Sequence, residues 1–368
     1  MRVSILTNGP GELWGWARPV SAELRRRGHS VSLRLLSCPF ASGHERAAAV
    51  RLAPDVLKGP HGPLRTWREL GNERTDRVLQ LGGDLIFGAR LARAAGAPLL
   101  CYTYGPKKGA ERAETFTAFP ATARAIRGAT AIGDLVRDAL ELDARDPSAA
   151  CWDWPEEPDS PRLLLFPGSR PGIRNAALSW LQSIVAELRP EFPGLRVRTL
   201  FPPFMPDPEL APWREAGLEP VRAGAGVAMR AADYALTQPG TNTLEMLHCG
   251  LPGLVAAPRA FLEHIPVAGL RGIVASMPLV GKRLRNMALE RVLKRYKGAI
   301  SLPNRMAGSP IMDELYGDVA PREIALGIAA ALRDPERRAR TRRALLALSG
   351  GPGAAARLCD ALESPKRT

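Results

Sequence analysis

Short apolar runs, each followed by a turn and then by a helical pattern, recur along the chain and limit its fold more than any other feature. Residues 163–166 show this clearly: the run ends in Pro167, Gly168, Ser169 and Arg170, and leucine and isoleucine then recur at helical spacing from 178 to 188. A short apolar run bounded by turn residues is typical of a buried strand, and the spacing that follows is typical of a helix. We therefore predict a strand, a tight turn and a helix here.

The same alternation occurs in two successive series. The predicted strands are residues 2–7, 31–36, 77–81, 98–104 and 129–132 in the first series, and 163–166, 197–201, 234–236 and 253–256 in the second. Helical segments join the strands, so each series predicts a parallel sheet with right-handed crossovers. Two series of comparable size predict an α/β chain of two Rossmann-like, doubly wound domains that face a cleft.

A change of composition between the two series predicts the domain boundary. Residues 151–161 are rich in proline and acidic residues and lack periodicity, which is typical of a linker. We predict an N-terminal domain over residues 1–155 and a C-terminal domain over 156–345, with a basic amphipathic segment at 261–298. Residues 346–368 are predicted to form a C-terminal helix and tail, and packing back on the N-terminal domain is one arrangement open to them. A helix is also predicted to follow residues 301–304 and to end at Leu315.

Basic residues outnumber acidic residues, 51 against 37, and the formal net charge is +14. An excess of this size predicts an anionic partner. Residues 271–297 hold eight basic residues and one glutamate among spaced apolar residues. This pattern is typical of a segment that lies on an anionic membrane surface. The alternative is a helical pair packed on the second domain with a solvated basic face.

Features that the sequence lacks bear on location and on cofactors. No run of about 18 apolar residues occurs, and residues 1–9 lack the long apolar core of a secretory signal. The five cysteines are scattered without a CxxC pair and the five histidines are dispersed, so neither a disulfide framework nor a metal cluster is expected. We predict a cytoplasmic protein, peripheral at the inner face of the cytoplasmic membrane, with no cofactor and no metal.

Two turns of the second series carry candidate binding residues. Free N–H groups at a helix start attract an anion, so Gly168 and Ser169 are candidates, and Arg170 can add a bidentate clamp. The alternative is an ordinary turn with a surface arginine.

The second of these turns lies in the segment LTQPGTNTLEML, residues 236–247. Gly240 turns the chain, and Thr241 and Asn242 offer polar side chains and N–H groups at a helix start, which suit a diphosphate held without a metal. Glu245, one turn later, can accept two hydrogen bonds from a ribose diol. The alternative is a helix cap in which Glu245 is the acidic partner of a capping box.

Two turns of the first series carry candidate catalytic carboxylates. Glu12 lies in the glycine-rich loop after the first strand, and Asp84 follows two glycines after the strand at 77–81. Either side chain can act as a base at the carboxyl end of a strand, although an aspartate before a helix is most commonly a cap. Lys107 and Lys108, after another strand, are candidates for contact with a phosphate or are simply solvated.

Taken together, these motifs resemble those of the lipid A disaccharide synthases, which are inverting glycosyltransferases of the two-domain B-type fold. FPGSR (166–170) resembles the family's PGSR, PGTNTLE (239–245) its SGTATLE, and SLPNRMAG (301–308) its SLPN segment with the same spacing to the next helix. Gly83-Asp84 and Ile132-Gly133 match two further turns. The resemblance spans nearly the whole chain. It departs in the first loop, at Asp134 where the family has histidine, and in a longer, more basic segment before Ser301.

The residues and the resemblance together predict transfer of a sugar from a UDP-sugar to a membrane-associated glycolipid or sugar phosphate, with inversion. Asp84 is the predicted base, which the family's aspartate at this position supports, and Glu12 is the second choice. Asn304 is expected to help to position the donor sugar or phosphate. No DxD-like carboxylate pair stands beside the donor loops, and the resemblance implies metal-free stabilisation of the leaving UDP.

Two other classes of function stay open. A UDP-sugar 2-epimerase uses the same fold and a similar diphosphate loop but needs no acceptor, and the cationic segment 271–297 argues against it. A non-catalytic nucleic-acid binder fits the charge. However, the sequence holds no recognised nucleic-acid motif, and its aromatic residues, 6% of the chain, are not interleaved with the basic runs. No nucleic-acid partner is therefore expected. The donor sugar, the acceptor and the oligomeric state are left open.

Overall fold

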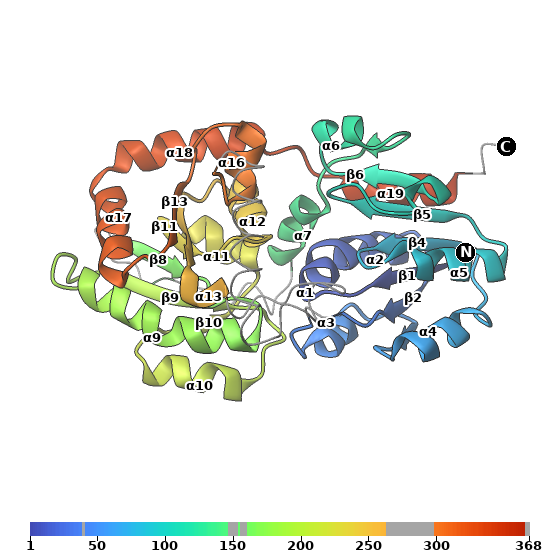
Figure 1. Cartoon of the computed structure of the whole chain (residues 1–368), viewed down its shortest axis with the longest axis horizontal. Coiled ribbons are helices and arrows are strands. Elements are labelled where there is room, and N and C mark those ends of the chain that lie inside the picture. The colour runs from blue at the N-terminus through green and yellow to red at the C-terminus, as the bar shows by residue number, and fades with distance from the viewer. Residues whose placement is uncertain (39–40, 146–153, 155–159, 263–297, 365–368) are drawn as a thin grey trace, which may run out of the picture. The chain divides into compact units, whose positions relative to one another are not determined.

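The structure is a computed structural model that describes residues 1–38, 41–145, 154, 160–262 and 298–364. Its contacts divide the chain into two compact units (Figure 1). Unit 1 comprises Met1–Leu142 and Gly350–Thr368, and unit 2 comprises Asp143–Ser349. The division predicted from the sequence fell after residues 155 and 345. The basic segment 271–297 lies outside the described residues, as does most of the predicted linker 151–161.

Unit 1 contains a parallel sheet of seven strands in the order β3-β2-β1-β4-β5-β6-β7. The strands are β1 (Arg2–Thr7), β2 (Ser30–Leu35), β3 (Val56–Lys58), β4 (Arg77–Leu81), β5 (Leu99–Thr103), β6 (Glu114–Thr117) and β7 (Thr130–Ala131). The central strand β1 places Val3 beside Val31 of β2 and beside Arg77 of β4. Its neighbours on both sides bury it, and its apolar residues account for this position.

Helices join and cover these strands. They are α1 (Pro10–Glu12), the π-helix η1 (Leu13–Ala17), α2 (Arg18–Arg26), α3 (Glu45–Arg51), α4 (Pro63–Leu70), α5 (Leu85–Ala95), the short 3₁₀ helix η2 (Ala110–Arg112), α6 (Pro120–Ala125), α7 (Leu135–Asp143) and α19 (Ala354–Glu363). The C-terminal helix α19 packs against α2 within unit 1. Arg27 donates hydrogen bonds from α2's end to Asp360 at 2.7 Å and to Glu363 at 2.8 Å.

Unit 2 contains a parallel sheet of six strands in the order β10-β9-β8-β11-β12-β13. The strands are β8 (Arg162–Leu165), β9 (Arg196–Phe201), β10 (Pro220–Arg222), β11 (Tyr234–Thr237), β12 (Gly253–Pro258) and β13 (Asp313–Gly317). The helices are α9 (Pro171–Leu188), α10 (Asp207–Glu215), α11 (Ala225–Ala231), α12 (Asn242–Cys249), α13 (Arg259–Leu262), α16 (Leu302–Ala307), α17 (Pro321–Arg333) and α18 (Pro335–Leu348).

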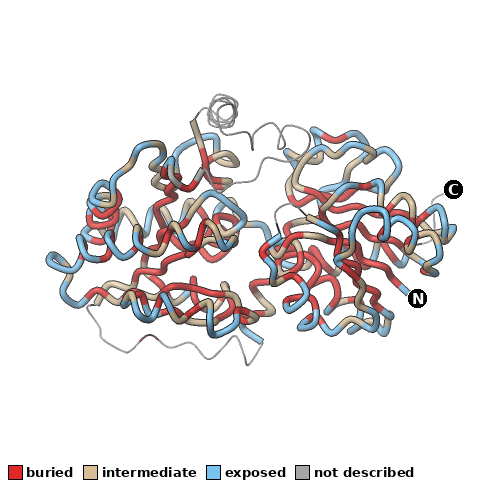
Figure 2. The backbone as a smooth tube through the Cα atoms, turned by 60° about the horizontal axis from the view of Figure 1, so that its bottom comes forward, coloured by how far each residue is buried: buried red, intermediate tan, exposed pale blue. Residues whose placement is uncertain are grey.

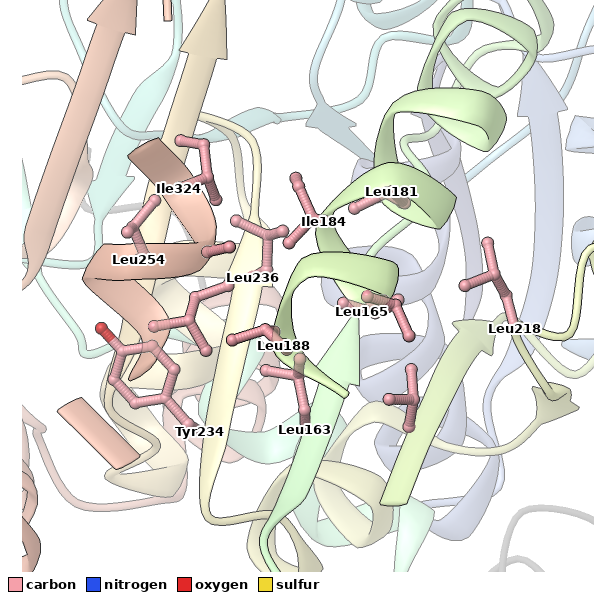
Figure 3. Packing of buried hydrophobic residues seen from close by; sticks show 14 of the residues in the cluster. Leu163, Leu165, Leu181, Ile184, Leu188, Leu218, Tyr234, Leu236, Leu254 and Ile324 are labelled. Carbon is pink, nitrogen blue, oxygen red and sulfur yellow. The ribbon is translucent and has the colours of Figure 1, made fainter. Parts of the chain in front are cut away.

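The core of unit 2 is apolar and lies between its sheet and the helices α9 and α17. Leu181 and Leu188 of α9 pack over Leu163 and Leu165 of β8, and Ile324 of α17 joins the same cluster (Figure 3). A fully buried side chain of this size stabilises the fold by about 1.5–3 kcal/mol. Figure 2 shows that in both units the strands consist mainly of buried residues and that the exposed residues lie mainly on the outer helices and loops.

The structure confirms the strands predicted from the sequence and corrects one predicted helix. The helix expected to run to Leu315 ends at Ala307, because Gly308 adopts a left-handed conformation with φ +66° and closes α16. The residues after it form β13, which pairs with β12 and places Asp313 beside Leu254. Four strands were not predicted, namely β3, β6, β10 and β13. No described helix combines the length and the apolar character needed to cross a membrane.

Candidate functional site

The predicted site residues fall at equivalent positions of the two sheets. In unit 1, β1 lies between β2 and β4; in unit 2, β8 lies between β9 and β11. The chain therefore reverses its direction of travel across the sheet at β1/β4 and at β8/β11. Ligands of open α/β sheets bind at such switch points, beyond the carboxyl ends of the strands. The four loops after β1, β4, β8 and β11, with the helix starts that follow, hold every predicted site residue except Asn304.

The loop between β8 and α9 depends on a glycine. Gly168 has φ +95°, and a Cβ atom there would lie 2.6 Å from Cγ2 of Ile173. Ser169 is exposed, and Arg170 is half-buried at the N-cap of α9. Because Pro171 at the first helical position has no N–H, the N–H groups of the next residues are the donors that this helix start can offer an anion.

Arg174, which the sequence reasoning missed, holds this loop from behind. Its side chain is 2% exposed, and its guanidinium donates to the Ser169 carbonyl at 3.1 Å and to Glu209 at 3.0 Å. It therefore fixes the backbone beside Arg170. The available signal was a second arginine one helical turn after the first, but its partner Glu209 lies on α10, far away in sequence.

The loop between β11 and α12 leaves its polar residues accessible. Gly240 and Thr241 are exposed, and Asn242 and Glu245 are half-buried. Thr241 is the N-cap residue and its side chain makes no capping hydrogen bond, so the capping-box alternative does not hold at this helix. Behind the loop, the buried Thr243 hydroxyl donates to the Gly240 carbonyl at 2.8 Å and accepts from the Leu302 N–H at 3.4 Å.

One side chain joins the two loops of unit 2. The amide of Gln238, just after β11, donates to the Phe166 carbonyl just after β8 at 3.0 Å. The Phe166 N–H in turn donates to the Leu236 carbonyl at 3.0 Å. The loops that lead into α9 and α12 are therefore held together at the ends of β8 and β11.

Asn304 does not have the role expected of it. Its side chain is 4% exposed. Its Oδ1 accepts from the N–H groups of Ile311 and Met312, both at 2.8 Å, and its Nδ2 donates to the Met312 carbonyl at 2.9 Å and to Glu314 at 2.7 Å. The amide has no hydrogen-bonding capacity left for a ligand. Asn304 instead fixes the segment between α16 and β13, and Glu314, which the sequence reasoning missed, is its partner.

Side chains fill the switch point of unit 1. The half-buried Glu12 lies against Gly9. A Cβ atom added to Gly82 would lie 3.0 Å from Cγ of Glu12 and 2.8 Å from Oδ1 of Asn8. The loops after β1 and β4 are thus in contact through Glu12 and Asn8. The predicted carboxylate is held at the carboxyl end of β1, beside the second switch-point strand.

Asp84 caps α5, as the structural alternative expected. Its Oδ1 accepts from the Ile86 N–H at 3.2 Å, while its side chain is exposed. The cap orients the carboxylate without burying it, so Asp84 remains able to contact a ligand. Nearby, the half-buried Lys107 donates from Nζ to the Gly83 carbonyl at 3.1 Å. This places an ammonium group beside the loop that carries Asp84.

A polar and aromatic cluster lies behind the first loop of unit 1. Trp16, in the π-helix, donates from Nε1 to the Tyr104 hydroxyl at 3.2 Å, and that hydroxyl donates to Asp134 at 2.6 Å. Asp134 is 2% exposed and also accepts from the Val136 N–H at 3.0 Å. Burial, reinforced by the negative charge of Asp134, raises the pKa of Tyr104 well above its ordinary value. The hydroxyl therefore stays protonated and keeps donating. Of this cluster, the sequence analysis singled out Asp134 and missed Trp16 and Tyr104.

Among the described residues, no group of three or more histidine, cysteine, aspartate or glutamate side chains is placed to hold a metal ion. No protein-family model matches the sequence, and no curated protein sequence matches it.

Solved structures do share its architecture. MurG from Acinetobacter baumannii is similar, with a TM-score of 0.57 and 16% identity over 98% of this chain and 99% of that chain. The chain has the GT-B fold. UDP-GlcNAc 2-epimerase from Neisseria meningitidis, solved with UDP-GlcNAc bound, is similar with a TM-score of 0.61 and 14% identity over 98% and 99% of the two chains. CalG4, a calicheamicin glycosyltransferase, has a TM-score of 0.57 and 15% identity over 99% and 98%.

The predicted fold class of two Rossmann-like α/β domains is thus confirmed. GT-B structures of both transferases and epimerases share it, so the choice of reaction depends on the chain's own residues.

Proposed function

We propose that this chain is a glycosyltransferase that moves a sugar from a UDP-sugar to a membrane-associated glycolipid or phosphorylated sugar, with inversion. The observation that carries the proposal is the pair of helix starts at the β8/β11 switch point. Gln238 holds the two loops that lead into these helices together, and the accessible residues Ser169, Gly240 and Thr241 lie just before the first turns. An anion-binding edge of this kind fits the diphosphate of a nucleotide sugar.

In this proposal unit 2 binds the donor. Gly168, Ser169 and Arg170 meet the diphosphate from α9, and Gly240, Thr241 and Asn242 meet it from α12. Glu245 accepts hydrogen bonds from the ribose hydroxyls. As the bond between the sugar carbon and the diphosphate breaks, negative charge grows on the leaving UDP, and the N–H groups and Arg170 stabilise it. The donor loops hold no carboxylate pair, and we expect this stabilisation to need no divalent ion.

Unit 1 supplies the base. The acceptor hydroxyl oxygen attacks the sugar carbon from the face opposite the leaving UDP, and a carboxylate takes the hydroxyl proton as the new bond forms. Asp84 is the first choice because it is exposed and oriented by its cap, and Glu12 is the second. Lys107, beside Asp84, suits a phosphate on the acceptor.

The resemblance to lipid A disaccharide synthases narrows the proposal to a glycolipid product. The motifs at 166–170 and 239–245 support a shared donor side. Asp134 stands where that family has histidine, and it is tied into the cluster with Tyr104 and Trp16. We therefore propose a relative that acts at the inner face of the cytoplasmic membrane on an acceptor of its own.

A UDP-sugar 2-epimerase is the second candidate. The favouring observation is the similarity to the Neisseria meningitidis enzyme solved with UDP-GlcNAc, which extends over 98% of this chain. Both candidates need a nucleotide edge on unit 2, and only the transferase needs an acceptor.

Titration calorimetry with UDP tests the donor site. We expect Glu245→Ala to weaken UDP binding by about 1–3 kcal/mol, the range for removing a partner from a buried polar group. Glu187→Ala, on the exposed face of α9, is the matched control and should leave the affinity unchanged. Unchanged UDP affinity in Glu245→Ala would remove the ribose assignment.

The reaction is tested by incubating UDP-sugars with and without a bacterial lipid extract. UDP release that requires the extract supports transfer. Isomerisation of the sugar without any extract supports the epimerase. If UDP neither binds nor stabilises the protein, both candidates fail.

A further inference from the structure

The face of unit 1 formed by α4 and α5 exposes large apolar side chains. Leu64 is 85% exposed, Ile86 50% and Trp67 39%. The two helices are in contact (Figure 1), and Trp67 of α4 packs edge-on against Phe87 of α5 with ring centroids 6.5 Å apart. We name this face, made by Leu64, Trp67 and Ile86 with the charged residues of both helices, the α4–α5 surface.

Its charged residues are almost all arginines. Arg65, Arg68 and Arg93 are exposed, and the Arg90 guanidinium lies 5.5 Å from the Trp67 ring centre. Helix α5 has no acidic residue within Leu85–Ala95. The one acidic residue of α4, Glu69, is engaged by Arg34 at 2.7 Å and by Arg65 at 2.9 Å. The surface therefore combines apolar side chains with a net positive charge, since only Arg65 among its arginines pairs with the acidic residue of α4.

A groove of about 1330 Å³ continues the surface past α5. Trp67 and Ile86 lie at its α4–α5 side, and Leu100 and Phe116 line its apolar part. Its charged lining is mainly basic: Arg77, Arg90, Arg93 and Arg112 against the single acidic residue Glu114. An apolar channel flanked by arginines suits the chain and the phosphate of one and the same molecule, as in a phospholipid.

We propose that the α4–α5 surface docks on an anionic phospholipid bilayer, with Leu64, Trp67 and Ile86 entering the interfacial region and the arginines contacting lipid phosphates. Apolar and aromatic side chains on a basic helical face are the combination that binds membrane interfaces, and each basic residue near an anionic surface adds to the attraction. An anionic bilayer offers both things that this surface lacks, an apolar region for the exposed side chains and phosphates for the unpaired arginines.

The surface borders the switch point of unit 1. Ile86 lies in the first turn of α5, and its N–H donates to Asp84. Docking through α4 and α5 would therefore bring the bilayer up to the loop that carries Asp84. The inference goes beyond the proposed reaction and does not depend on it, because vesicle binding needs no catalysis.

Vesicle flotation of the full chain tests the proposal. The vesicles are phosphatidylcholine alone, or equal parts of phosphatidylcholine and phosphatidylglycerol. The surface variant is Leu64→Ser with Ile86→Ser. Its matched control is Leu326→Ser with Leu346→Ser, which changes two leucines of unit 2 that are 58% and 44% exposed. Thermal melting followed by circular dichroism checks that all proteins are folded.

We expect the unchanged chain to favour the phosphatidylglycerol vesicles and to release from them as salt is added. The surface variant should lose about tenfold or more in partitioning, while the control keeps the original value. Arg68→Gln with Arg93→Gln should lower binding to the anionic vesicles by about fivefold per arginine and leave weak binding to neutral vesicles unchanged.

Three results would overturn the proposal. The surface variant floats as well as its control, which would assign any membrane contact to another segment such as 271–297. The surface variant and the Leu326→Ser, Leu346→Ser control lose binding equally. Or the unchanged chain is a dimer in solution that the surface variant dissociates, without any effect on vesicles, which would assign the surface to a second copy of the chain.

Discussion

The two switch points differ in what lies at the carboxyl ends of their strands. In unit 1, side chains occupy the position: Glu12 lies against Gly9 and Gly82, and Lys107 donates to the Gly83 carbonyl at 3.1 Å. In unit 2, Ser169 and Thr241 are exposed at the helix starts, and Gln238 bridges the two loops by donating to the Phe166 carbonyl at 3.0 Å. The groups that shape the loops of unit 2 act from behind, as Arg174 does on the Ser169 carbonyl.

This difference separates two kinds of chemistry on one fold. N–H groups at helix starts bind anions but cannot take up a proton. Carboxylates can take up a proton but repel a diphosphate. In this chain the two carboxylates proposed as bases, Glu12 and Asp84, lie on unit 1, and the helix starts proposed for the diphosphate lie on unit 2. Variants in the two units should therefore have separable effects on binding and on turnover.

The largest expected effect belongs to the carboxylates of unit 1. Asp84→Asn should lower the transfer rate by about 10²–10⁴-fold, the usual contribution of a general base. UDP affinity should not change, because asparagine still caps α5 and unit 2 is untouched. Initial rates at saturating UDP-sugar, with calorimetry on the same protein, check both statements.

Glu12→Gln is the companion variant for this test. If Glu12→Gln abolishes turnover and Asp84→Asn does not, the base is Glu12 and the cap is all that Asp84 provides. If both variants retain full turnover, the division between the two switch points does not describe catalysis.

The next largest effect concerns the interiors of the units. Both units have an apolar core cluster and a buried arginine. Unit 1 buries Arg34 at 1% exposure, bonded to both Glu69 and Glu73 at 2.7 Å, whereas Arg174 of unit 2, at 2% exposure, is bonded to the single carboxylate Glu209 at 3.0 Å. Removing one partner of a buried pair costs about 3 kcal/mol. Glu73→Gln should therefore lower the unfolding free energy of unit 1 by about this amount at neutral pH, measured by urea denaturation.

The pH dependence of this loss follows from the pKa shifts. Burial alone would raise the pKa of Glu73, but Arg34 and Lys58 outweigh it and lower the pKa. Hydrogen bonds from Arg34 and Arg65 lower the pKa of Glu69 to about 2. The stabilisation is thus complete above the unfolded-state pKa of about 4.3 and fades as the pH falls below it. A Glu73→Gln deficit that stayed constant into acid would rule out a charge-based origin.

The sequence predicted the elements whose signal is local. Strands β1, β4, β8 and β11 are apolar runs that end in turn residues, and so the loops after them could be found. Strands β3, β10 and β13 lie at sheet edges and are three to five residues long. Their pairing comes from neighbouring strands rather than from a periodic pattern. The helix predicted to end at Leu315 was wrong for the same reason, because the edge strand β13 is short and has little apolar character.

The sequence could predict the parts of the site that are formed by residues close together in the chain. The motifs around Arg170 and Thr241 are local, and they follow adjacent strands whose ends Gln238 holds together. Their role in binding stays a prediction. Asn304 was misjudged because the three residues that its amide bonds, Ile311, Met312 and Glu314, lie beyond the SLPN motif. Arg174 and Tyr104 were missed because each works through a residue of a distant element, Glu209 in one case and Asp134 in the other.

Two glycines sharpen the comparison within unit 2. Gly168→Ala should destabilise the loop by about 2 kcal/mol, because φ is +95° and the new Cβ would lie 2.6 Å from Ile173. Gly240→Ala should change stability by less than about 0.5 kcal/mol, since no atom lies within 4 Å of a Cβ placed there. Thermal melting checks both expectations.

Gly240→Ala should nevertheless weaken UDP binding if the backbone approaches the diphosphate closely, because the added methyl group would then meet the ligand. A variant of normal stability and normal UDP affinity would show that no ligand reaches Gly240. The two glycines thus separate a requirement of the fold from a requirement of binding.

The smallest effect tests whether the cluster behind the loop of unit 1 acts on that unit alone. Tyr104→Phe removes the hydroxyl that accepts from Trp16 and donates to Asp134, which should cost about 1 kcal/mol of stability. Because burial and Asp134 raise the pKa of Tyr104, the deficit should not change at pH values up to about 10, the ordinary tyrosine pKa. Loosening the π-helix should lower turnover through the adjoining Glu12 and leave UDP affinity intact. If calorimetry found that affinity reduced as much as turnover, the donor site would not be confined to unit 2, and the contrast between the two switch points would lose its functional meaning.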